Sequence, residues 1–371
     1  MKKTIAVLFG GQSGEHEVSL VSAQAVLATL DPEKYHVLPV GITKDGRWLT
    51  GPGAMPALLA AADPTRLPAS ATAGPHYPEE RLDEAEDEVA APATHAGPGL
   101  PTVARLLPPG VDVVFPVLHG PMGEDGTVQG LLELAGVAYV GCGVAASAVG
   151  MDKALMKAAF AAAGLPLLPW VLVRRADWQR DPAGTYAAVE DALPYPVFVK
   201  PANMGSSVGV GKAKDRAGLE QAIADAARYD RRIVIEQGIP AREIEISVLG
   251  NEAPEASVPG EIVPSGEWYD YNTKYIDGGS AIHIPAPVGA ALAERVRALA
   301  IQAFLAIDGT GLARVDFLLD KGSGELWINE ANTMPGFTPI SMYAKMWAAS
   351  GLSYPDLLDR LITLALSRKQ L

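Results

Sequence analysis

The stretch GLARVDFLLDKGSGELWINEANTMPGFT, residues 311–338, is the part of the chain from which the expected fold and site can be worked out. Residues 313–320 and 326–329 are short, rich in apolar side chains and separated by a Gly/Ser turn, which is typical of two strands joined in a hairpin. If residues 322–324 form a three-residue loop, the two strands pair in a single register. The cross-strand pairs are then Lys321 with Glu325, Asp316 with Glu330, and Arg314 with Asn332.

This register predicts a metal site on one face of the hairpin. Side chains alternate between the two faces of a strand, so Asp316, Glu330, Arg314 and Asn332 are expected to share a face. Two carboxylates and an amide oxygen form an all-oxygen ligand set, which suits Mg²⁺ together with substrate phosphates. Arg314 favours this interpretation, because a cation beside a metal site needs an anionic ligand to share. The alternative is the solvated outer face of an edge hairpin, where alternating polar residues are common.

The composition limits the classes of function. A chain of 371 residues, 49% hydrophobic and 20% charged, is expected to form two or three globular domains. A net charge of −13 would repel nucleic acid and anionic membranes, so neither is an expected partner. Cys142 is the single cysteine, which excludes a disulfide within the chain. No apolar run reaches membrane-spanning length, and the apolar start soon ends in glycines, so a cytoplasmic protein is expected.

The N-terminal region reads as an open α/β domain. An apolar strand at 3–9, the turn GGQSG, a helix at 15–30 and a strand at 35–42 form its first unit. The glycines do not match G-x-G-x-x-G, which argues against a nicotinamide-dependent dehydrogenase. A later strand at 111–118 ends at His119, where such sheets bind ligands, although a structural histidine fits equally well. The Pro-, Ala- and acid-rich segment 51–110 is expected to be a surface excursion without a role in the chemistry.

The second half of the chain adds features of a nucleotide site. A helix at 152–163 precedes strands at 194–200 and 208–213, which enclose the Gly/Ser loop 203–207. This loop could cover phosphates, but it is not a Walker A loop because its spacing is wrong and Ala213 replaces the required hydroxyl residue. The remaining expected elements are strands at 233–239 and 243–249, an aromatic lid at about 264–287, a helix at 290–307 behind the hairpin, and closing helices at 341–349 and 354–367.

Taken together, the motifs resemble those of the D-alanine–D-alanine ligase family of the ATP-grasp superfamily. The matching segments follow one another along the chain: GGQSGEHEVS (10–19), HGPMGEDGTVQG (119–130), MDK (151–153), VKPANMGSSVGV (199–210), YDYNTKY (269–275) and RVDF with NEANTMPGFTPIS (314–317 and 329–341). Each motif is modest evidence, but the ordered set is specific and omits chiefly the 51–110 segment.

The resemblance implies an α/β and α+β architecture with an ATP-grasp fold. A parallel α/β domain at 1–148 would precede a central ATP-grasp subdomain at 149–235 and a C-terminal one at 236–371, each of the last two built on an antiparallel sheet. It also implies a reaction in which ATP phosphorylates one D-alanine and the amine of a second attacks the acyl phosphate, yielding a dipeptide for peptidoglycan synthesis. The resemblance further implies two divalent ions, Mg²⁺ or Mn²⁺, and a homodimer. Whether a monovalent cation takes part is left open.

The family's functional residues can be carried over position by position. Glu15, Ser206 and Tyr275 would form a hydrogen-bonded trio, and Arg314 and the N–H of Gly336 would stabilise an oxyanion. Residues expected at ATP are Lys153, Lys200, Ser206, Ser207, Glu236, Gln237, Ile239, Glu243, Lys274, Asn329 and Glu330. Asp316, Glu330 and Asn332 would bind the metal. Residues expected at the two D-alanines are Glu15, His119, Arg314, Gly336, Ser341 and Met342.

Two other functions remain compatible with the residues. Another ATP-grasp carboxylate–amine ligase would share the hairpin and the lysines, but it has no reason to keep Glu15, Tyr275 and Ser341 together. A non-catalytic ATP-binding regulator would be expected to lack a metal or oxyanion residue, and none is missing from the motifs.

Overall fold

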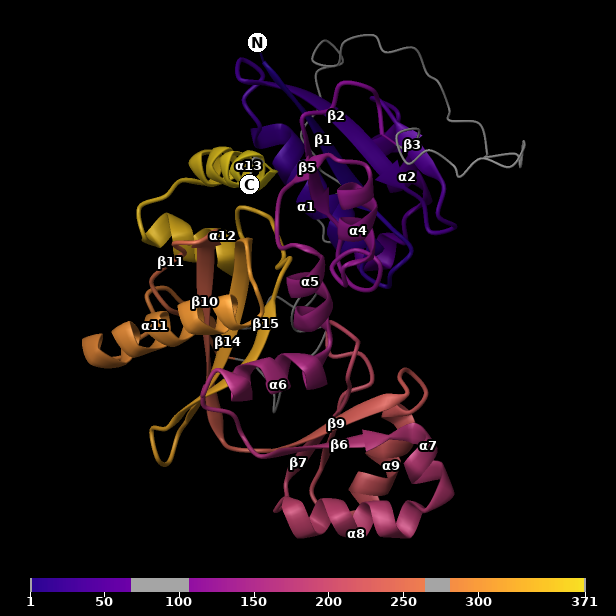
Figure 1. The fold of residues 1–371 in the computed structure, drawn as a ribbon, viewed down its shortest axis with the longest axis vertical. Coiled ribbons are helices and arrows are strands. Elements are labelled where there is room, and N and C mark those ends of the chain that lie inside the picture. Colours follow the sequence, from indigo (N-terminus) through magenta and orange to yellow (C-terminus); the bar gives the residue numbers. More distant parts are fainter. Residues whose placement is uncertain (1, 68–106, 264–280, 370–371) are drawn as a thin grey trace.

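A computed structural model of the chain describes residues 2–67, 107–263 and 281–369. Three sheets follow one another in space, with the N-terminal sheet at one end and a four-stranded sheet at the other (Figure 1). The predicted α/β and α+β class is confirmed. None of the helices in these ranges combines the length and apolarity that a membrane span requires.

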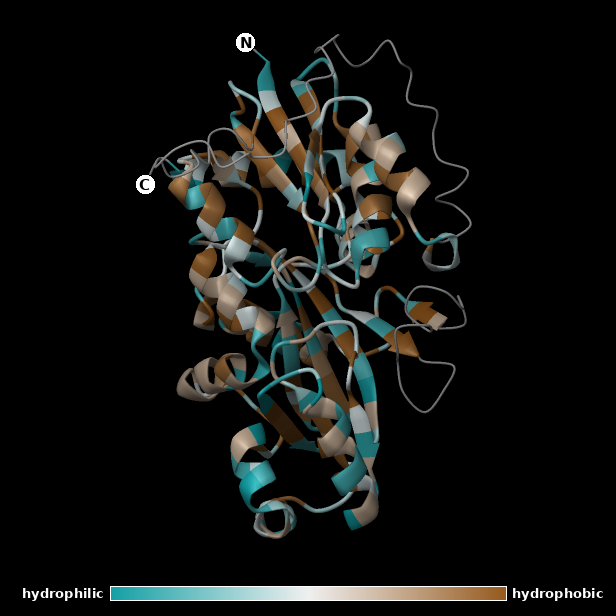
Figure 2. Cartoon of the chain, turned by 90° about the vertical axis from the view of Figure 1, so that its right-hand side faces the viewer, coloured by the Kyte–Doolittle hydropathy of each residue, from teal (hydrophilic) through white to brown (hydrophobic). Residues whose placement is uncertain are grey.

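The N-terminal sheet has the strand order β3-β2-β1-β4-β5. Its strands are β1 (Lys3–Gly10), β2 (Tyr35–Ile42), β3 (Trp48–Thr50), β4 (Val113–Val117) and β5 (Ala138–Tyr139). All neighbours are parallel except β3, which runs antiparallel to β2. β1 and β4 are continuous apolar runs because helices cover both faces of a parallel sheet, and Figure 2 shows these strands as mainly hydrophobic. The predicted open parallel domain is therefore confirmed.

Helices α1 (His16–Thr29), α2 (Ala54–Ala61) and α4 (Thr127–Leu134), with a 3₁₀ turn at Pro64–Arg66, belong to this region. The prediction that 51–110 is a surface excursion is wrong for its first part. Met55 and Leu58 of α2 are each only 2% exposed and pack into the core beneath the sheet. The short apolar stretch of α2 was hidden among Pro, Gly and Ala residues, and residues 68–106 lie outside the described ranges.

The central sheet has the order β6-β9-β7-β8, with every neighbouring pair antiparallel. Its strands are β6 (Trp170–Arg174), β7 (Val197–Pro201), β8 (Gly211–Ala213) and β9 (Arg232–Gln237). Helices α7 (Arg175–Arg180), α8 (Pro182–Ala192) and α9 (Arg216–Ala226) accompany it. Leu219 and Ile223 of α9 are fully buried in a cluster with Val197 and Val199 of β7, so one face of the sheet carries the core.

The C-terminal sheet has the order β13-β12-β10-β14-β15, with β11 beside β10, and is also antiparallel. Its strands are β10 (Ala241–Gly250), β11 (Glu255–Ala256), β12 (Gly260–Val263), β13 (Ala281–His283), β14 (Gly311–Asp320) and β15 (Leu326–Asn332). Helices α5 (Val144–Met151), α6 (Lys153–Ala162) and α11 (Ala290–Ala306) share a core with it, which confirms that the 290–307 helix packs behind the hairpin. The boundaries expected at 148/149 and 235/236 fall inside α5 and β9.

The last two helices, α12 (Met342–Ala349) and α13 (Tyr354–Lys369), return the chain to the N-terminal sheet (Figure 1). Phe337, which precedes α12, has its ring centroid 5.6 Å from that of Phe115 in β4. Leu357 and Leu361 of α13 are fully buried in the same cluster as Ile5 and Leu20. The C-terminal segment is thus part of the N-terminal core, which holds residues 333–341 at the junction of the domains.

Replacing Leu361 by Ala should destabilise the protein by about 2–5 kcal/mol, because it opens a cavity in this shared core. Leu134→Ala is the matched control: Leu134 is 83% exposed on α4, and its truncation should change the unfolding free energy by less than about 0.5 kcal/mol. Urea denaturation measures both values. Equal effects of the two substitutions would show that α13 is only loosely attached.

Candidate active site between the central and C-terminal sheets

The β14–β15 hairpin presents alternating polar side chains on one face. Asp316 pairs with Glu330 and Arg314 pairs with Asn332, as the sequence predicted. The predicted turn is wrong, however, because Asp320 is the residue that pairs with Glu325, through a 2.9 Å bond from its N–H to the Glu325 carbonyl oxygen. The pair of Lys321 with Glu325 therefore does not form.

A β-bulge reconciles the wrong turn with the right pairs. Phe317 pairs with Ile328 while Asp316 pairs with Glu330, so Asn329 is an extra residue on β15. The bulge shifts the register by one residue and restores the predicted pairing beyond it. It also places Asn329 and Glu330, which are consecutive and both partly exposed, at the same cavity.

That cavity has a volume of about 570 Å³ and lies between the central and C-terminal sheets. Every predicted site residue within the described ranges lines it. These residues are Glu15, His119, Lys153, Lys200, Ser206, Ser207, Glu236, Gln237, Ile239, Glu243, Arg314, Asp316, Asn329, Glu330, Asn332, Gly336, Ser341 and Met342. Lys274, Tyr275 and most of the predicted lid at 264–287 lie outside the described residues.

Arg314 and Asp316 form an ion pair with two hydrogen bonds at the hairpin. The guanidinium donates Nε–H and Nη2–H to the two carboxylate oxygens of Asp316, each at 2.7 Å. Nε of Arg314 also lies 3.2 Å from the carboxylate of Glu245 on β10. Burial alone would lower the pKa of Arg314, but Asp316 and Glu245 outweigh it and hold that pKa well above its ordinary value, so the guanidinium stays charged.

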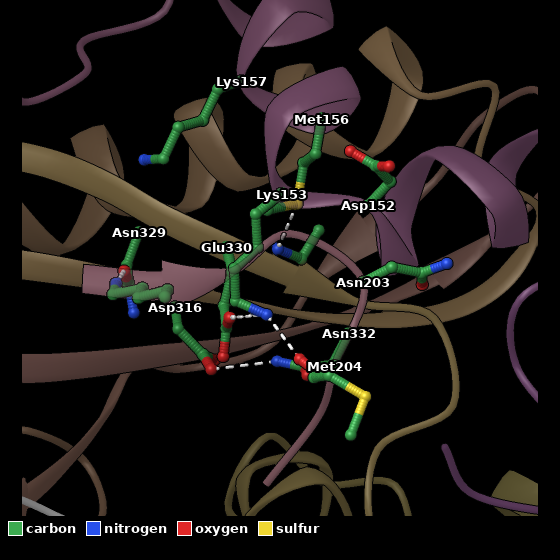
Figure 3. Close-up of polar contacts among 12 residues, drawn as sticks. Asp152, Lys153, Met156, Lys157, Asn203, Met204, Asp316, Asn329, Glu330 and Asn332 are labelled. Carbon is green, nitrogen blue, oxygen red and sulfur yellow. Dashed lines mark hydrogen bonds and ion pairs between the residues drawn. The ribbon is translucent and has the colours of Figure 1, made fainter. Parts of the chain in front are cut away.

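The oxygen atoms around Asp316 fit a divalent cation. Asn332 donates its amide N–H to Asp316 at 3.0 Å, which leaves the amide oxygen of Asn332 as an acceptor beside the carboxylates of Asp316 and Glu330. Figure 3 shows these side chains turned toward one space. Among the residues described, no three His, Cys, Asp or Glu side chains form a complete metal site. An ion would therefore need further oxygen ligands, such as phosphate.

Lys153 reaches this group from the first turn of α6. Its Nζ donates to the carbonyl of Met204 at 2.7 Å and lies 3.9 Å from the Glu330 carboxylate (Figure 3). Asp152 caps the helix by accepting the N–H groups of Ala154 and Leu155, and it binds Arg232 of β9 at 2.8 and 3.1 Å. These contacts hold the start of α6, and therefore Lys153, against the central sheet.

Lys200 and Lys157 share one buried carboxylate. Both Nζ atoms lie 3.1 Å from Glu236, which is 3% exposed. Burial would raise the pKa of Glu236, but Lys157 and Lys200 overcome this and lower it to about 2. Glu236, expected at ATP, binds both lysines and also lines the cavity. One carboxylate at the wall of the cavity therefore holds two lysine side chains.

Glu15 and the loop at 203–207 approach each other across the domains. The hydroxyl group of Ser206 donates a hydrogen bond to the carboxylate of Glu15. This bond joins the start of the first helix of the N-terminal region to the central subdomain. Ser206 and Ser207 have φ values of 49° and 58°, in the left-handed region that non-glycine residues rarely adopt. Two consecutive left-handed residues make a sharp backbone reversal in this loop, and its role at phosphates stays a prediction.

His119 is a neutral, buried side chain. Its Nδ1 lies 3.1 Å from the Met334 carbonyl oxygen and therefore carries the proton, while Nε2 is 3.4 Å from the hydroxyl of Ser22. Burial lowers the pKa of His119. Both the structural and the ligand-binding interpretations fit this arrangement, because the ring is held firmly and also lines the cavity.

Ser341 and Met342 lie at the start of α12. Ser341 is its N-cap residue and donates its hydroxyl to the Thr338 carbonyl at 2.6 Å. Met342 is 8% exposed and clusters with Ile262 and Met346. A helix N-terminus favours an anionic group, so the backbone here suits a carboxylate.

Sequence reasoning missed three residues that this arrangement depends on: Glu245, Lys157 and Glu124. The alternation Glu243, Glu245, Ser247 along β10 could have placed Glu245 on the cavity face. Lys157 follows Lys153 at i+4, on the same side of α6. Glu124 stands in the quoted motif HGPMGEDGTVQG, but no role was carried over to it.

Glu236→Gln should lower the unfolding free energy by roughly 3 kcal/mol at pH 7, because two buried lysines then lose their anionic partner. The pKa of Glu236 falls from 4.5 to about 2 on folding, so its contribution is complete above pH 4.5 and is lost as the pH falls toward 2. Urea unfolding at pH 7, 4.5 and 3 should show the gap between wild type and variant shrinking. Glu325→Gln, at an exposed position, is the control. A gap that does not change with pH would contradict the buried ion pairs.

Comparison with known proteins agrees with this geometry. Residues 4–142 match the family described as D-ala D-ala ligase N-terminus, and residues 159–363 match D-ala D-ala ligase C-terminus. The chain is 52% identical to the D-alanine–D-alanine ligase of Heliobacterium modesticaldum, over 99% of this chain and 96% of the relative. It is 48% identical to that of Geobacillus kaustophilus, over 100% and 96%.

Solved structures give the same result. The D-alanine–D-alanine ligase from Coxiella burnetii is 37% identical with a TM-score of 0.78, covering 100% of this chain and 95% of the other. The VanG D-Ala:D-Ser ligase from Enterococcus faecalis is 33% identical with a TM-score of 0.80, covering 98% and 100%. With both halves matched, and with the hairpin and the lysines around one cavity, this chain belongs to the D-alanine–D-alanine ligase family.

Proposed function

We propose that the protein uses ATP to join two D-alanine molecules into D-alanyl-D-alanine through a D-alanyl phosphate. The observation that carries this proposal is the meeting of Arg314, Asp316 and Glu330 with Lys153 and Lys200 around one cavity. Such a set offers ligands for a cation and positive charge for phosphates, which phosphoryl transfer to a carboxylate requires.

ATP would lie along the side of the cavity formed by the central sheet. Lys153 and Lys200 carry charge suited to its phosphates, and the left-handed loop at Ser206–Ser207 would cover them. Gln237 at the end of β9 and Ile239 just after it would contact the adenine, and Glu243 the ribose hydroxyl groups. Glu236 acts by holding Lys200 and Lys157, which keeps the Lys200 ammonium at the cavity wall. Lys274 would add a further positive charge.

ATP use and dependence on a divalent metal follow from the family. Asp316, Glu330 and Asn332 would hold Mg²⁺ or Mn²⁺, two ions in all, with Asn329 beside them. Bound there, the metal would neutralise charge on the phosphates. Asp316 is shared with Arg314, so a bound cation and this guanidinium compete for the same carboxylate.

The substrates would occupy the end of the cavity nearest the N-terminal domain. Glu15 would bind the ammonium group of the first D-alanine, with Ser206 and Tyr275 completing the hydrogen-bonded trio. The start of α12 at Ser341 and Met342 would receive the carboxylate of the second. His119, which lines the cavity, would lie near its amine, as base or as orienting group.

A carboxylate resists attack by an amine, and phosphorylation gives it a leaving group. The phosphoryl group passes to the first D-alanine, the second amine then attacks the acyl carbon, and phosphate departs as the amide forms. Arg314 and the Gly336 N–H would stabilise the negative oxygen of the tetrahedral intermediate. The proposal extends to a cytoplasmic homodimer that supplies the peptidoglycan precursor.

Glu330→Gln should reduce turnover by at least about 100-fold while leaving folding intact, because it removes charge from the cation site on an otherwise polar strand face. Phosphate release from ATP with D-alanine measures turnover, and thermal unfolding measures folding. Glu325→Gln, on the exposed hairpin turn, should keep wild-type turnover. Near-normal activity of Glu330→Gln would favour the solvated-hairpin interpretation.

D-Alanine should be much preferred over D-lactate as second substrate at neutral pH. The Lys274-Tyr275 pair resembles the lid of ligases that use an amine nucleophile. Competition between the two compounds, with both products quantified by mass spectrometry, measures the preference. A panel of other amino acids in the same assay distinguishes this enzyme from another ATP-grasp carboxylate–amine ligase. Comparable yields of dipeptide and depsipeptide would contradict this specificity.

A further inference from the structure

Glu124 lies in the turn between β4 and α4 and reaches the cavity. Its Oε1 accepts the N–H of Gly120 at 2.7 Å, while the N–H groups of Gly123 and Glu124 both bond back to the Gly120 carbonyl at 3.1 Å. This compact turn orients the carboxyl group. Glu124 lines the cavity together with Glu15 and His119, yet the family resemblance assigns it no role.

Glu15 lies against the same glycine. A Cβ atom on Gly120 would be only 2.8 Å from Oε2 of Glu15, and the N–H of that glycine binds Glu124. Two carboxyl groups therefore adjoin one residue at the end of the cavity proposed for the first D-alanine. One of them, Glu15, also accepts the hydroxyl of Ser206.

The electrostatic surroundings of Glu124 favour its protonated form. Burial and the negative charge of Glu15 raise the pKa of Glu124 to about 8, with a smaller contribution from Glu330 on β15. The Gly120 N–H and Lys153 of α6 act in the opposite direction but are weaker. His119, at the end of β4, is buried with its pKa lowered, so it supplies no compensating positive charge. At neutral pH the carboxyl group of Glu124 is then protonated.

We propose that Glu124 is a second acidic group for the ammonium of the first amino-acid substrate, and that its carboxyl group releases its proton when that ammonium binds. The inference rests on the proposed function, which places the ammonium at Glu15. An ammonium ion beside both carboxyl groups screens them from each other and favours ionisation of Glu124. The proton passes to the solvent, and the bound state becomes an ammonium between two carboxylates.

Calorimetry of D-alanine binding to the ADP-loaded protein tests this step. At pH 7, titrations in phosphate and in Tris, buffers with different ionisation enthalpies, give the number of protons released. The wild type should release about one proton more than Glu124→Gln. Its affinity for D-alanine should rise by up to about tenfold for each unit by which the pH is raised toward 7, because a step that releases a proton is favoured at higher pH. The amide oxygen of glutamine can still accept the Gly120 N–H, so the turn is retained.

Equal proton release from wild type and Glu124→Gln would overturn the role of Glu124 and assign the proton to another group, such as the substrate amine. Glu325→Gln, at the exposed hairpin turn, should match the wild type. If D-alanine does not bind the wild type at all, the proposed function fails and the role of Glu124 fails with it.

Unfolding without substrate tests the protonation of Glu124 independently. Because its pKa rises from 4.5 in the unfolded chain to about 8 on folding, ionisation costs folded-state stability, and that cost grows as the pH rises from 4.5 to 8. Urea denaturation at pH 5, 6.5 and 8 should show Glu124→Gln gaining stability relative to the wild type as the pH rises. If the difference in unfolding free energy between the two proteins does not change with pH, the proposal for Glu124 is overturned even where D-alanine binding is normal. This result therefore distinguishes a failure of the Glu124 proposal from a failure of the proposed function.

Discussion

The pairing of β14 with β15 is the constraint on which the site depends. Because the strands are antiparallel and side chains alternate, the pairing brings Asp316 opposite Glu330 and Arg314 opposite Asn332 on the face away from the core. The bulge at Asn329 is essential to this result. Without its extra residue, the observed turn would pair Asp316 with Asn329, and the following polar residues would turn toward the core.

Positively charged side chains are gathered around the cavity of a protein whose overall charge is negative. The chain carries a net charge of −13, yet its cavity contains cations beneath and beside the polar hairpin face. Each buried cation has an anionic partner, because an unpaired buried charge is costly. Glu236 serves both Lys157 and Lys200, whereas Arg314 has both Asp316 and Glu245. Lys157 and Lys200 thus share one carboxylate, whereas two carboxylates hold the guanidinium of Arg314 in place.

The cavity is assembled from every part of the chain described. The N-terminal domain supplies Glu15 and His119, the central sheet supplies Lys200, and the C-terminal sheet supplies the hairpin. The packing of α12 and α13 onto the N-terminal core makes this possible, because it fixes the segment with Gly336 and Ser341 between the domains. The hydrogen bond from Ser206 to Glu15 joins the central loop to the same junction.

Regular patterns in the amino-acid sequence were enough to place the strand at 35–42, the helix at 290–307 and the shared face of Arg314, Asp316, Glu330 and Asn332, because apolar periodicity and pairing are local properties. The antiparallel sheets were expected only from the family resemblance. The partners of Glu236, the contact of Glu245 with Arg314 and the burial of α2 were decided by tertiary packing, since they join residues distant in sequence. Tertiary packing also decided the bulge, because the register of a strand pair depends on how both strands fit the core beneath them. The turn residues alone indicated a different loop.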